Sequence, residues 1–330
     1  MIQQTFTCSF PETLSQAYQM RREMDNSMYL GGGTDLVPLM KSGVKKPAHL
    51  IGLEKLSELR VIEKRDGGLY VGAMASLWEI LRSPLVKDAF PTLSQACRRV
   101  ASPQIRTMGT LGGNLLQDRR CLYYNQSEAW RSSISRCYKT GGHVCHQAPA
   151  SDWCRGLYYS DTAPVLWSLG AQASIFEDEE KWMPVEQLTK EHVHRNGGVA
   201  TEERILKGFW IPCPPENSRM QFEKFSVRGS LVFSVMNLAL QVWLVEEGIK
   251  GRIVVGGTSP VPVLLEETGK RLETSARFSR TDWQHTGELA LKELKKKSRF
   301  IRESGLSLQV KRDTLQHVAS VIEGLMKKEA

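Results

Sequence analysis

Four cysteines in one polar stretch are the residues whose type and spacing point most directly to chemistry. Their spacing is C-x15-C-x7-C-x8-C, and they are Cys121, Cys137, Cys145 and Cys154. The stretch also holds His143 and His146 and shows no sustained apolar period, which is not typical of a core helix or strand. Because long loops without secondary structure are uncommon unless they are functional or disordered, the pattern indicates that a metal or cluster ties this loop down.

The sequence leaves roles without a metal open for these cysteines. A free cysteine is often a small buried hydrophobe, and a disulfide requires an oxidising compartment. The chain opens with MIQQTFTCSF, which lacks a secretory apolar segment, so we predict a cytoplasmic protein. Structural zinc prefers paired C-x2-C ligands, which are absent here, whereas an iron–sulfur cluster on four thiolates tolerates varied spacings. The spacing alone does not choose between zinc and iron–sulfur.

A glycine-rich turn forms a second candidate site. Gly31-Gly32-Gly33-Thr34-Asp35-Leu36 follows a predicted buried strand at Met28–Leu30, and we expect Thr34 to cap the next helix. Successive glycines leave backbone N–H groups bare, which makes a cradle for a phosphate or pyrophosphate. The turn matches neither G-x-G-x-x-G nor a Walker loop, so alone it is equally consistent with a tight strand-to-helix connection.

A second turn, MGTLGGNL at 108–115, strengthens the nucleotide interpretation. Gly112 and Gly113 permit close approach of a ligand to the backbone. Thr110 and Asn114 can donate hydrogen bonds to it. Two such turns can hold the two phosphates of one dinucleotide. Since the first of the four cysteines follows within seven residues of Asn114, we expect the group that they hold to lie beside that ligand.

The composition is that of a globular protein. The 330 residues are 41% hydrophobic, 24% charged and 8% aromatic, and no apolar run approaches the roughly 18 residues of a membrane span. The net charge is +8, but the densest basic run, 292–302, is interrupted by Glu293, Leu294 and Phe300 and lacks a nucleic-acid-binding spacing. We therefore predict no nucleic-acid partner and no membrane span, and interpret the run as a solvated helical face or subunit contact.

The order of predicted elements places the two candidate sites. A first unit has β-α-β order, with a helix from Ser9 or Pro11 to near Asn26. A hairpin turn at Asp66–Gly68 and a helix capped by Ser76 precede the second glycine turn. The segment 212–215 is typical of a linker, and we place a domain boundary there. Beyond it we predict strands and, at the end of the chain, a helix with an apolar stripe of Leu315, Val318, Ile322 and Leu325.

These motifs resemble the FAD-binding medium subunits of the xanthine oxidase family of molybdenum hydroxylases, over essentially the whole chain. GGGTDL and GTLGGNL stand where that family has its two flavin pyrophosphate turns, and SDTAPVLWSLGA is similar to its flavin-contacting Ser-Asp segment. FEKFSVRGS and RIVVGGTSPVP are similar to signatures of its C-terminal domain. The cysteine spacing, with CLYYNQSEAWR, is similar to the β subunits of 4-hydroxybenzoyl-CoA reductases, in which an inserted loop carries a [4Fe-4S] cluster on four cysteines.

The resemblance implies an α+β fold with a two-part FAD-binding region and a C-terminal domain. The FAD-binding region is expected at 1–213, as a small β-α-β unit at 1–57 and a larger α+β unit at 58–213. The larger unit would carry the inserted iron–sulfur loop at about 117–157. A C-terminal α+β medium-subunit domain, with a small antiparallel sheet and helices, is expected at 214–330.

The resemblance also implies which residues contact the cofactors. The [4Fe-4S] ligands would be Cys121, Cys137, Cys145 and Cys154. The implied FAD contacts are Leu30, Gly31, Gly32, Gly33, Thr34, Asp35, Leu36, Ala101, Gly109, Thr110, Gly112, Gly113, Asn114, Ser160, Asp161, Leu206 and Lys224. Without the resemblance, Asp161 would be interpreted as a helix N-cap, Lys224 as a solvated edge charge and Leu206 as a core residue.

The implied activity is that of an electron-transfer subunit of an oxidoreductase, with no catalytic residue of its own. Electrons would enter from a ferredoxin-like donor at the [4Fe-4S] loop, pass to FAD, and continue to [2Fe-2S] clusters on a small subunit and molybdenum on a large one. The resemblance implies a dimer of such heterotrimers, whose large subunit dehydroxylates 4-hydroxybenzoyl-CoA. Two alternatives stay open. The chain could be the FAD subunit of an oxidative hydroxylase that delivers electrons to an external acceptor, or a zinc-stabilised binding module.

Overall fold

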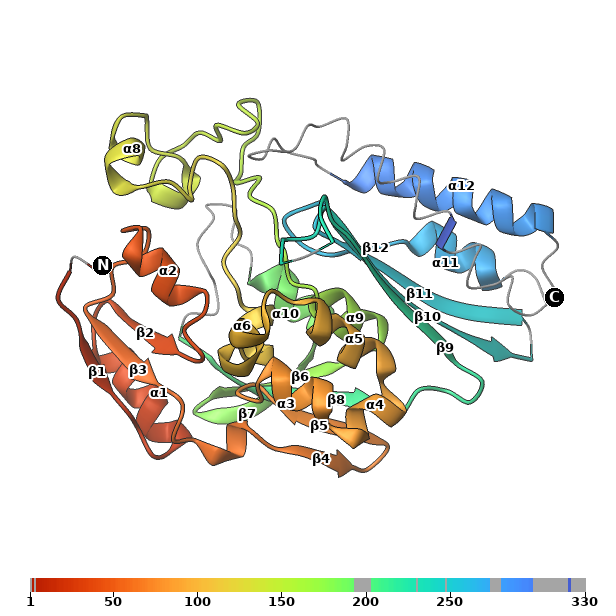
Figure 1. Ribbon diagram of the computed structural model, residues 1–330, viewed down its shortest axis with the longest axis horizontal. Coiled ribbons are helices and arrows are strands. Elements are labelled where there is room, and N and C mark those ends of the chain that lie inside the picture. Colours follow the sequence, from red (N-terminus) through yellow and green to blue (C-terminus); the bar gives the residue numbers. More distant parts are fainter. Residues whose placement is uncertain are drawn as a thin grey trace.

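Three β-sheets with helices packed against them organise the chain (Figure 1). This computed structural model describes residues 2, 4–192, 203–229, 231–246, 248–273, 280–298 and 320–321. Parallel strands with helices come first, and two antiparallel sheets follow. The expected α+β class, with an antiparallel sheet in the C-terminal region, is confirmed.

The N-terminal unit is a parallel sheet of three strands in the order β1-β3-β2. Its elements are β1 (Thr7–Ser9), α1 (Leu14–Glu23), β2 (Ser27–Leu30), α2 (Leu36–Lys41) and β3 (His49–Gly52). Helix α1 begins later than predicted because Thr13 is its N-cap, and the Thr13 hydroxyl accepts a hydrogen bond from the Gln16 N–H at 3.1 Å. Leu14 and Ala17 bury one face of α1 in a core shared with Ile51 on β3. This packing positions the first glycine turn, which leaves β2.

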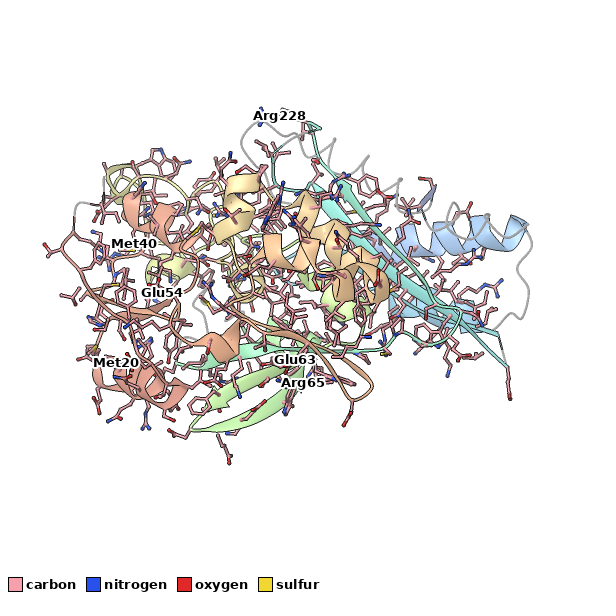
Figure 2. The ribbon with its side chains drawn as sticks, turned by 60° about the horizontal axis from the view of Figure 1, so that its bottom comes forward. Met20, Met40, Glu54, Glu63, Arg65 and Arg228 are labelled. Atoms are coloured by element: carbon pink, nitrogen blue, oxygen red, sulfur yellow. The ribbon has the colours of Figure 1, made fainter. Side chains whose placement is uncertain are left out.

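The middle unit is built on an antiparallel sheet of five strands in the order β4-β5-β8-β6-β7. Its strands are β4 (Ile62–Arg65), β5 (Gly68–Gly72), β6 (Gln172–Glu177), β7 (Glu179–Pro184) and β8 (Ile205–Pro212). The predicted turn at 66–68 joins β4 to β5. Glu63 and Arg65 lie close together on β4 (Figure 2), with 2.8 Å between Arg65 Nη2 and Glu63 Oε1.

Helices of the middle unit pack on this sheet and lead into the second glycine turn. They are η1 (Ser57–Leu59), α3 (Leu77–Arg82), α4 (Pro84–Ala89), α5 (Pro91–Arg99), α6 (Pro103–Met108), α7 (Leu111–Leu115), α9 (Ala163–Ser168) and α10 (Val185–Glu191). Ser76 caps α3 as predicted, in a capping box with Glu79. The second glycine turn forms the connection from α6 into α7.

The cysteine stretch is an excursion between α7 and α9 that closes at its base. Arg120 and Leu157 exchange two backbone hydrogen bonds of 2.9 Å, so the two ends of the excursion lie side by side. It contains the short helices α8 (Glu128–Ser132) and η2 (Tyr138–Thr140). It lies beside α2 (Figure 1), where the Arg131 guanidinium donates to the carbonyl oxygen of Gly43 at 2.7 Å.

The C-terminal unit is an antiparallel sheet of four strands in the order β12-β11-β10-β9. Its elements are β9 (Arg219–Phe225), β10 (Met236–Val245), β11 (Gly248–Gly256), β12 (Val263–Leu264), α11 (Glu266–Glu273) and α12 (Arg280–Lys297). Helix α11 packs on β11 with α12 beside it (Figure 1), and Met236, Ile253 and Leu294 are fully buried between them. The predicted last stripe, Leu315, Val318, Ile322 and Leu325, lies outside the described residues. Within the described ranges, no helix has the length and apolar character needed to cross a bilayer.

Candidate functional site

The two glycine turns line one cavity of about 220 Å³ between the N-terminal and middle units. Residues from both units form its walls, and the turns enter it from β2 and from α6. The predicted FAD contacts that line it are Gly31, Gly32, Gly33, Thr34, Asp35, Leu36, Thr110, Gly112, Gly113 and Leu206. The structure therefore brings together two motifs that are about 80 residues apart in the sequence.

Close backbone packing explains the glycines of both turns. A Cβ atom on Gly32 would lie 1.6 Å from the carbonyl oxygen of Met108, so the first turn rests directly on the end of α6. Gly33 has a φ of +71°, which L side chains rarely adopt. In the second turn, a Cβ atom on Gly112 would lie 2.8 Å from the Cβ of Ala73. A side chain at Gly32 would force the first turn away from the end of α6, and one at Gly112 would force the second turn away from Ala73. The cradle for a phosphate-bearing ligand therefore depends on glycine.

Only one of the two threonines in the glycine turns caps a helix. The Thr110 hydroxyl accepts a hydrogen bond from a backbone N–H within α7 at 3.0 Å and so caps that helix. Helix α2 begins after Asp35, which makes no side-chain cap bond, so the prediction that Thr34 caps α2 is wrong. The Asp35 carboxylate is turned instead toward the base of the cysteine excursion. It accepts from the Asp118 N–H at 3.1 Å and pairs with the Arg120 guanidinium at 2.5 Å.

Cationic side chains that the sequence interpretation missed line the same cavity. Arg21 comes from α1, Lys45 from the segment after α2, and Arg204 from the position directly before β8. Lys45 is half of a Lys-Lys pair close behind the first glycine turn, and that pair was a usable signal. Arg204 already pairs with Glu177 and Glu191, which offset its charge. Arg21 and Lys45 make the cavity more favourable for an anionic ligand.

Two buried titratable groups also line the cavity. His192 follows α10, with its Nε2 3.1 Å from the carbonyl oxygen of Leu116, and burial lowers its pKa to about 4. Burial would raise the pKa of Asp118, but the charges of Lys139 and Lys45 and a hydrogen bond from Lys139 outweigh it and hold that pKa below its usual value. At neutral pH the cavity wall therefore carries a neutral imidazole and a charged carboxylate. Neither residue belongs to a local motif that would have identified it.

The other predicted FAD contacts lie outside this cavity lining. They are Leu30, Ala101, Gly109, Asn114, Ser160, Asp161 and Lys224. Leu30 and Gly109 directly precede lining residues of the two turns. Ala101 has a φ of +40°, an uncommon conformation for a residue with a side chain, at the connection from α5 to α6.

Four of these outer residues belong to one buried polar group. Asp161 Oδ2 and Lys224 Nζ are 2.6 Å apart, and each side chain is only 5% exposed. The Asn114 side-chain oxygen accepts from the Ser160 hydroxyl at 2.8 Å. Asn237 Nδ2 donates to the carbonyl oxygen of Ser160 at 3.1 Å and to Asp161 Oδ1 at 2.8 Å. Burial raises the pKa of Asp161 despite the charge of Lys224.

The contacts of this polar group rule out the interpretations of Asp161 as a helix N-cap and of Lys224 as a solvated charge. Asp161 does not cap α9, because the Ser160 hydroxyl accepts from the Ala163 N–H at 3.0 Å while the Asp161 carboxylate pairs with Lys224. Lys224 is not a solvated edge charge, because it is buried and also donates to a backbone carbonyl on α5 at 2.8 Å. Asn237 was not predicted, although an amide near the start of the largely apolar strand β10 was a signal for it.

The four cysteines line a second, much smaller cavity of about 20 Å³. All four are free, so they form no disulfide. Cys121 Sγ accepts from the Tyr124 N–H at 3.2 Å, and Cys154 Sγ accepts from the Gly156 N–H at 3.4 Å. In the part of the chain that the structure describes, no three His, Cys, Asp or Glu side chains form a group that could hold one metal ion. The four thiols therefore line one common space.

Comparison with known proteins identifies the family. The family described as "FAD binding domain in molybdopterin dehydrogenase" matches residues 4–214. The aldehyde oxidoreductase FAD-binding subunit PaoB of Escherichia coli K12 is 28% identical over 283 residues, which cover 82% of this chain and 87% of that protein. The carbon monoxide dehydrogenase medium chain of Hydrogenophaga pseudoflava is 32% identical over 116 residues, which cover 35% of this chain and 40% of that one.

Solved structures share the fold. A chain of the carbon monoxide dehydrogenase from Hydrogenophaga pseudoflava matches with a TM-score of 0.78 at 17% identity, over 99% of both chains. A chain of quinoline 2-oxidoreductase from Pseudomonas putida 86 matches with a TM-score of 0.71 at 18% identity, over 99% of this chain and 97% of that one. These identities are evidence for the fold alone. The family match itself spans both glycine turns and more than half of the sequence, so the chain belongs to the FAD-binding medium subunits of the molybdenum hydroxylase family.

Proposed function

We propose that this chain holds FAD between the two glycine turns and serves as an electron-transfer subunit of a molybdenum hydroxylase-type complex. The observation that carries this proposal is the direct packing of the turns around one cavity, with Gly32 against Met108. The backbone N–H groups of the turns would bind the pyrophosphate, as at other glycine-rich turns. FAD supplies the redox chemistry, since a flavin can accept two electrons and release them singly. The protein binds, orients and shields it.

The proposed FAD contacts are both sets of residues named above, those that line the cavity and those outside it. The support for the outer set is its connection to the second turn. Asn114 ends that turn and bonds to Ser160, which leads to the buried pair of Asp161 and Lys224. A buried ion pair held by further hydrogen bonds gives a rigid polar surface, which suits the positioning of a cofactor.

We also propose that Cys121, Cys137, Cys145 and Cys154 ligate a [4Fe-4S] cluster. The residues fit this group because all four line a single cavity. In such a cluster each thiolate binds a different iron, so four cysteines around one space match its number of ligands. Backbone N–H groups directed at Cys121 and Cys154 would stabilise negative charge on these sulfurs. A bound cluster would supply one-electron transfer.

Partners and substrate are proposed from resemblance to relatives. The relatives include a FAD-binding subunit of an aldehyde oxidoreductase and a medium chain of a carbon monoxide dehydrogenase, so this chain would also work within a larger complex. We propose a large molybdenum subunit and a small [2Fe-2S] subunit, in a dimer of heterotrimers, with a ferredoxin-like donor at the cysteine excursion. The similarity of that excursion to 4-hydroxybenzoyl-CoA reductases supports reductive dehydroxylation of 4-hydroxybenzoyl-CoA by the large subunit.

An oxidative hydroxylase is the second candidate, because a relative that matches 82% of this chain is the FAD-binding subunit of an aldehyde oxidoreductase. In that case electrons would leave FAD for an external acceptor. Rapid flavin reduction by reduced ferredoxin supports the reductive function. Rapid reoxidation by dyes or dioxygen, without reduction by ferredoxin, supports the oxidative one.

Iron and flavin analysis of the anaerobically purified complex tests the cofactor assignment. We expect Cys137→Ser to lose about four irons per chain relative to the natural protein. We expect it to retain FAD, because the glycine turns make their contacts without the cysteines. Cys213→Ser, which alters an exposed cysteine outside the excursion, should keep both cofactors. Zinc in place of iron would reject the cluster, and loss of FAD from Cys137→Ser would show that the excursion supports the flavin site.

A further inference from the structure

A buried ion pair spans the wall between the flavin cavity and the cysteine cavity. Asp118 lines the first cavity and Lys139 lines the second. The Lys139 ammonium donates to Asp118 Oδ1, and the exposed fractions of the two side chains are 3% for Lys139 and 9% for Asp118. Charges buried this deeply are costly unless they are paired and hydrogen-bonded, so the two groups depend on each other.

Further contacts fix the lysine on the cysteine side. Lys139 Nζ donates to the carbonyl oxygen of Arg119 at 2.8 Å and lies 4.0 Å from the centroid of the Tyr124 ring. Tyr124 lines the cysteine cavity as well, and its N–H donates to Cys121 Sγ. The positive charge therefore has a defined position beside the four sulfurs.

The aspartate is fixed on the flavin side. Its N–H donates to Asp35 in the first glycine turn at 3.1 Å. Burial, the charge of Asp118 and a hydrogen bond to Asp118 raise the pKa of Tyr124, so the carboxylate also contacts that phenol. A continuous set of contacts thus leads from the first glycine turn through Asp118 to Lys139.

We propose that the Lys139–Asp118 pair sets the difference between the reduction potentials of the two cofactors, an inference that rests on the proposed function. The lysine charge stabilises the additional electron on a cluster held by the cysteines and so raises its potential. The aspartate charge disfavours additional negative charge on FAD and so lowers its potential. The pair is therefore oriented to hold an electron on the cysteine side and to reduce the driving force for transfer to FAD. Both are positioning residues that act through the electric field.

Redox titration of the intact complex tests this orientation, with the cluster followed by electron paramagnetic resonance and FAD by absorbance. In Lys139→Met we expect the cluster potential to become more negative by a tenfold change in its reduction equilibrium, which is about 59 mV for one electron. In Asp118→Asn we expect the FAD potential to become more positive. The double variant should have a wider gap between the two potentials than either single variant.

The control removes the same charge from an exposed position. Lys181 pairs with Glu177 at the edge of the middle sheet and its side chain is 49% exposed, so Lys181→Met should leave both potentials unchanged because water screens that charge. A Lys139→Met complex that binds iron and FAD at unchanged potentials would overturn this inference and leave the proposed function intact. A natural complex without iron would overturn the proposed cluster instead. If Lys139→Met does not retain iron, the question is decided by Lys139→Arg and by the FAD potential of Asp118→Asn. An unchanged FAD potential in Asp118→Asn rejects the inference.

Discussion

At the scale of single residues, the most demanding positions are those where two backbone segments approach more closely than a side chain permits. The first glycine turn meets the end of α6 at Gly32, where a Cβ atom would lie 1.6 Å from a carbonyl oxygen. Neither partner is the flexible end of a side chain, so neither can move without shifting a turn. Gly229, by contrast, has no atom within 4 Å of an added Cβ.

We therefore predict that Gly32→Ala loses bound FAD and destabilises the chain by about 1–3 kcal/mol, the usual cost of overpacking. The ratio of FAD to protein after purification and the midpoint of urea unfolding measure the two effects. Gly229→Ala is the matched control and should keep FAD with a stability change below about 0.5 kcal/mol. Normal FAD content in Gly32→Ala would show that the turns can separate without loss of the site.

At the scale of elements, α10 closes one wall of the flavin cavity through its last turn. His192 follows that helix and contacts the carbonyl oxygen of Leu116 after α7, so it connects α10 with the segment that carries the second glycine turn. Burial keeps its ring neutral, with a pKa of about 4. The connection between these two elements should therefore weaken in acid.

The sign of this pH dependence follows from the two states of the chain. An unfolded histidine has a pKa of about 6.5, so between there and about 4 the unfolded state binds more protons than the folded state. Stability is present above pH 6.5 and is lost as the pH falls, by about 2 kcal/mol between pH 7 and pH 5. Urea unfolding at both pH values should show a smaller loss in His192→Gln. His285→Gln, at an exposed position on α12, should behave like the natural protein. An equal loss of stability between pH 7 and pH 5 in all three proteins would contradict the prediction.

At the scale of the whole molecule, the pair of Asp161 and Lys224 joins the middle unit to the C-terminal sheet. Asp161 precedes α9, Lys224 lies on β9, and Asn237 on β10 donates to the same carboxylate. Lys224 also donates to the carbonyl oxygen of Arg99 at the end of α5. Four elements therefore depend on one buried ion pair, which also stands in the proposed flavin site.

We predict that Lys224→Met destabilises the chain by roughly 3–5 kcal/mol, because it leaves a buried carboxylate without its counter-charge. The double variant Asp161→Asn/Lys224→Met should recover much of that loss, since no unpaired charge remains. Lys250→Met, at an exposed position on β11 of the same sheet, is the control and should have little effect. Urea unfolding measures all three. Equal stabilities of the single and double variants would show that burial of the charge is not the cause.

Local chemistry made much of this protein predictable from its sequence. The hairpin at 66–68, the cap at Ser76 and the two glycine turns follow from residue types that act within a few positions, and the structure has them where they were expected. The motifs that resemble the molybdenum hydroxylase medium subunits lie in the same turns, so the family was predictable too. The domain boundary near 213 and the individual FAD contacts stay predictions. The prediction for Thr34 was wrong because Asp35 binds the distant Arg120 and Asp118, and no local rule contains that contact.

By itself the sequence determined where the backbone turns tightly and which residues are available as thiol ligands. Only the tertiary structure decided that the four thiols share one cavity, that Lys224 is buried, and that Asp118 and Lys139 join two cavities. The reason is physical. A turn or a cap depends on neighbours in the chain, whereas the charge state and burial of a polar side chain depend on partners that folding brings from distant positions.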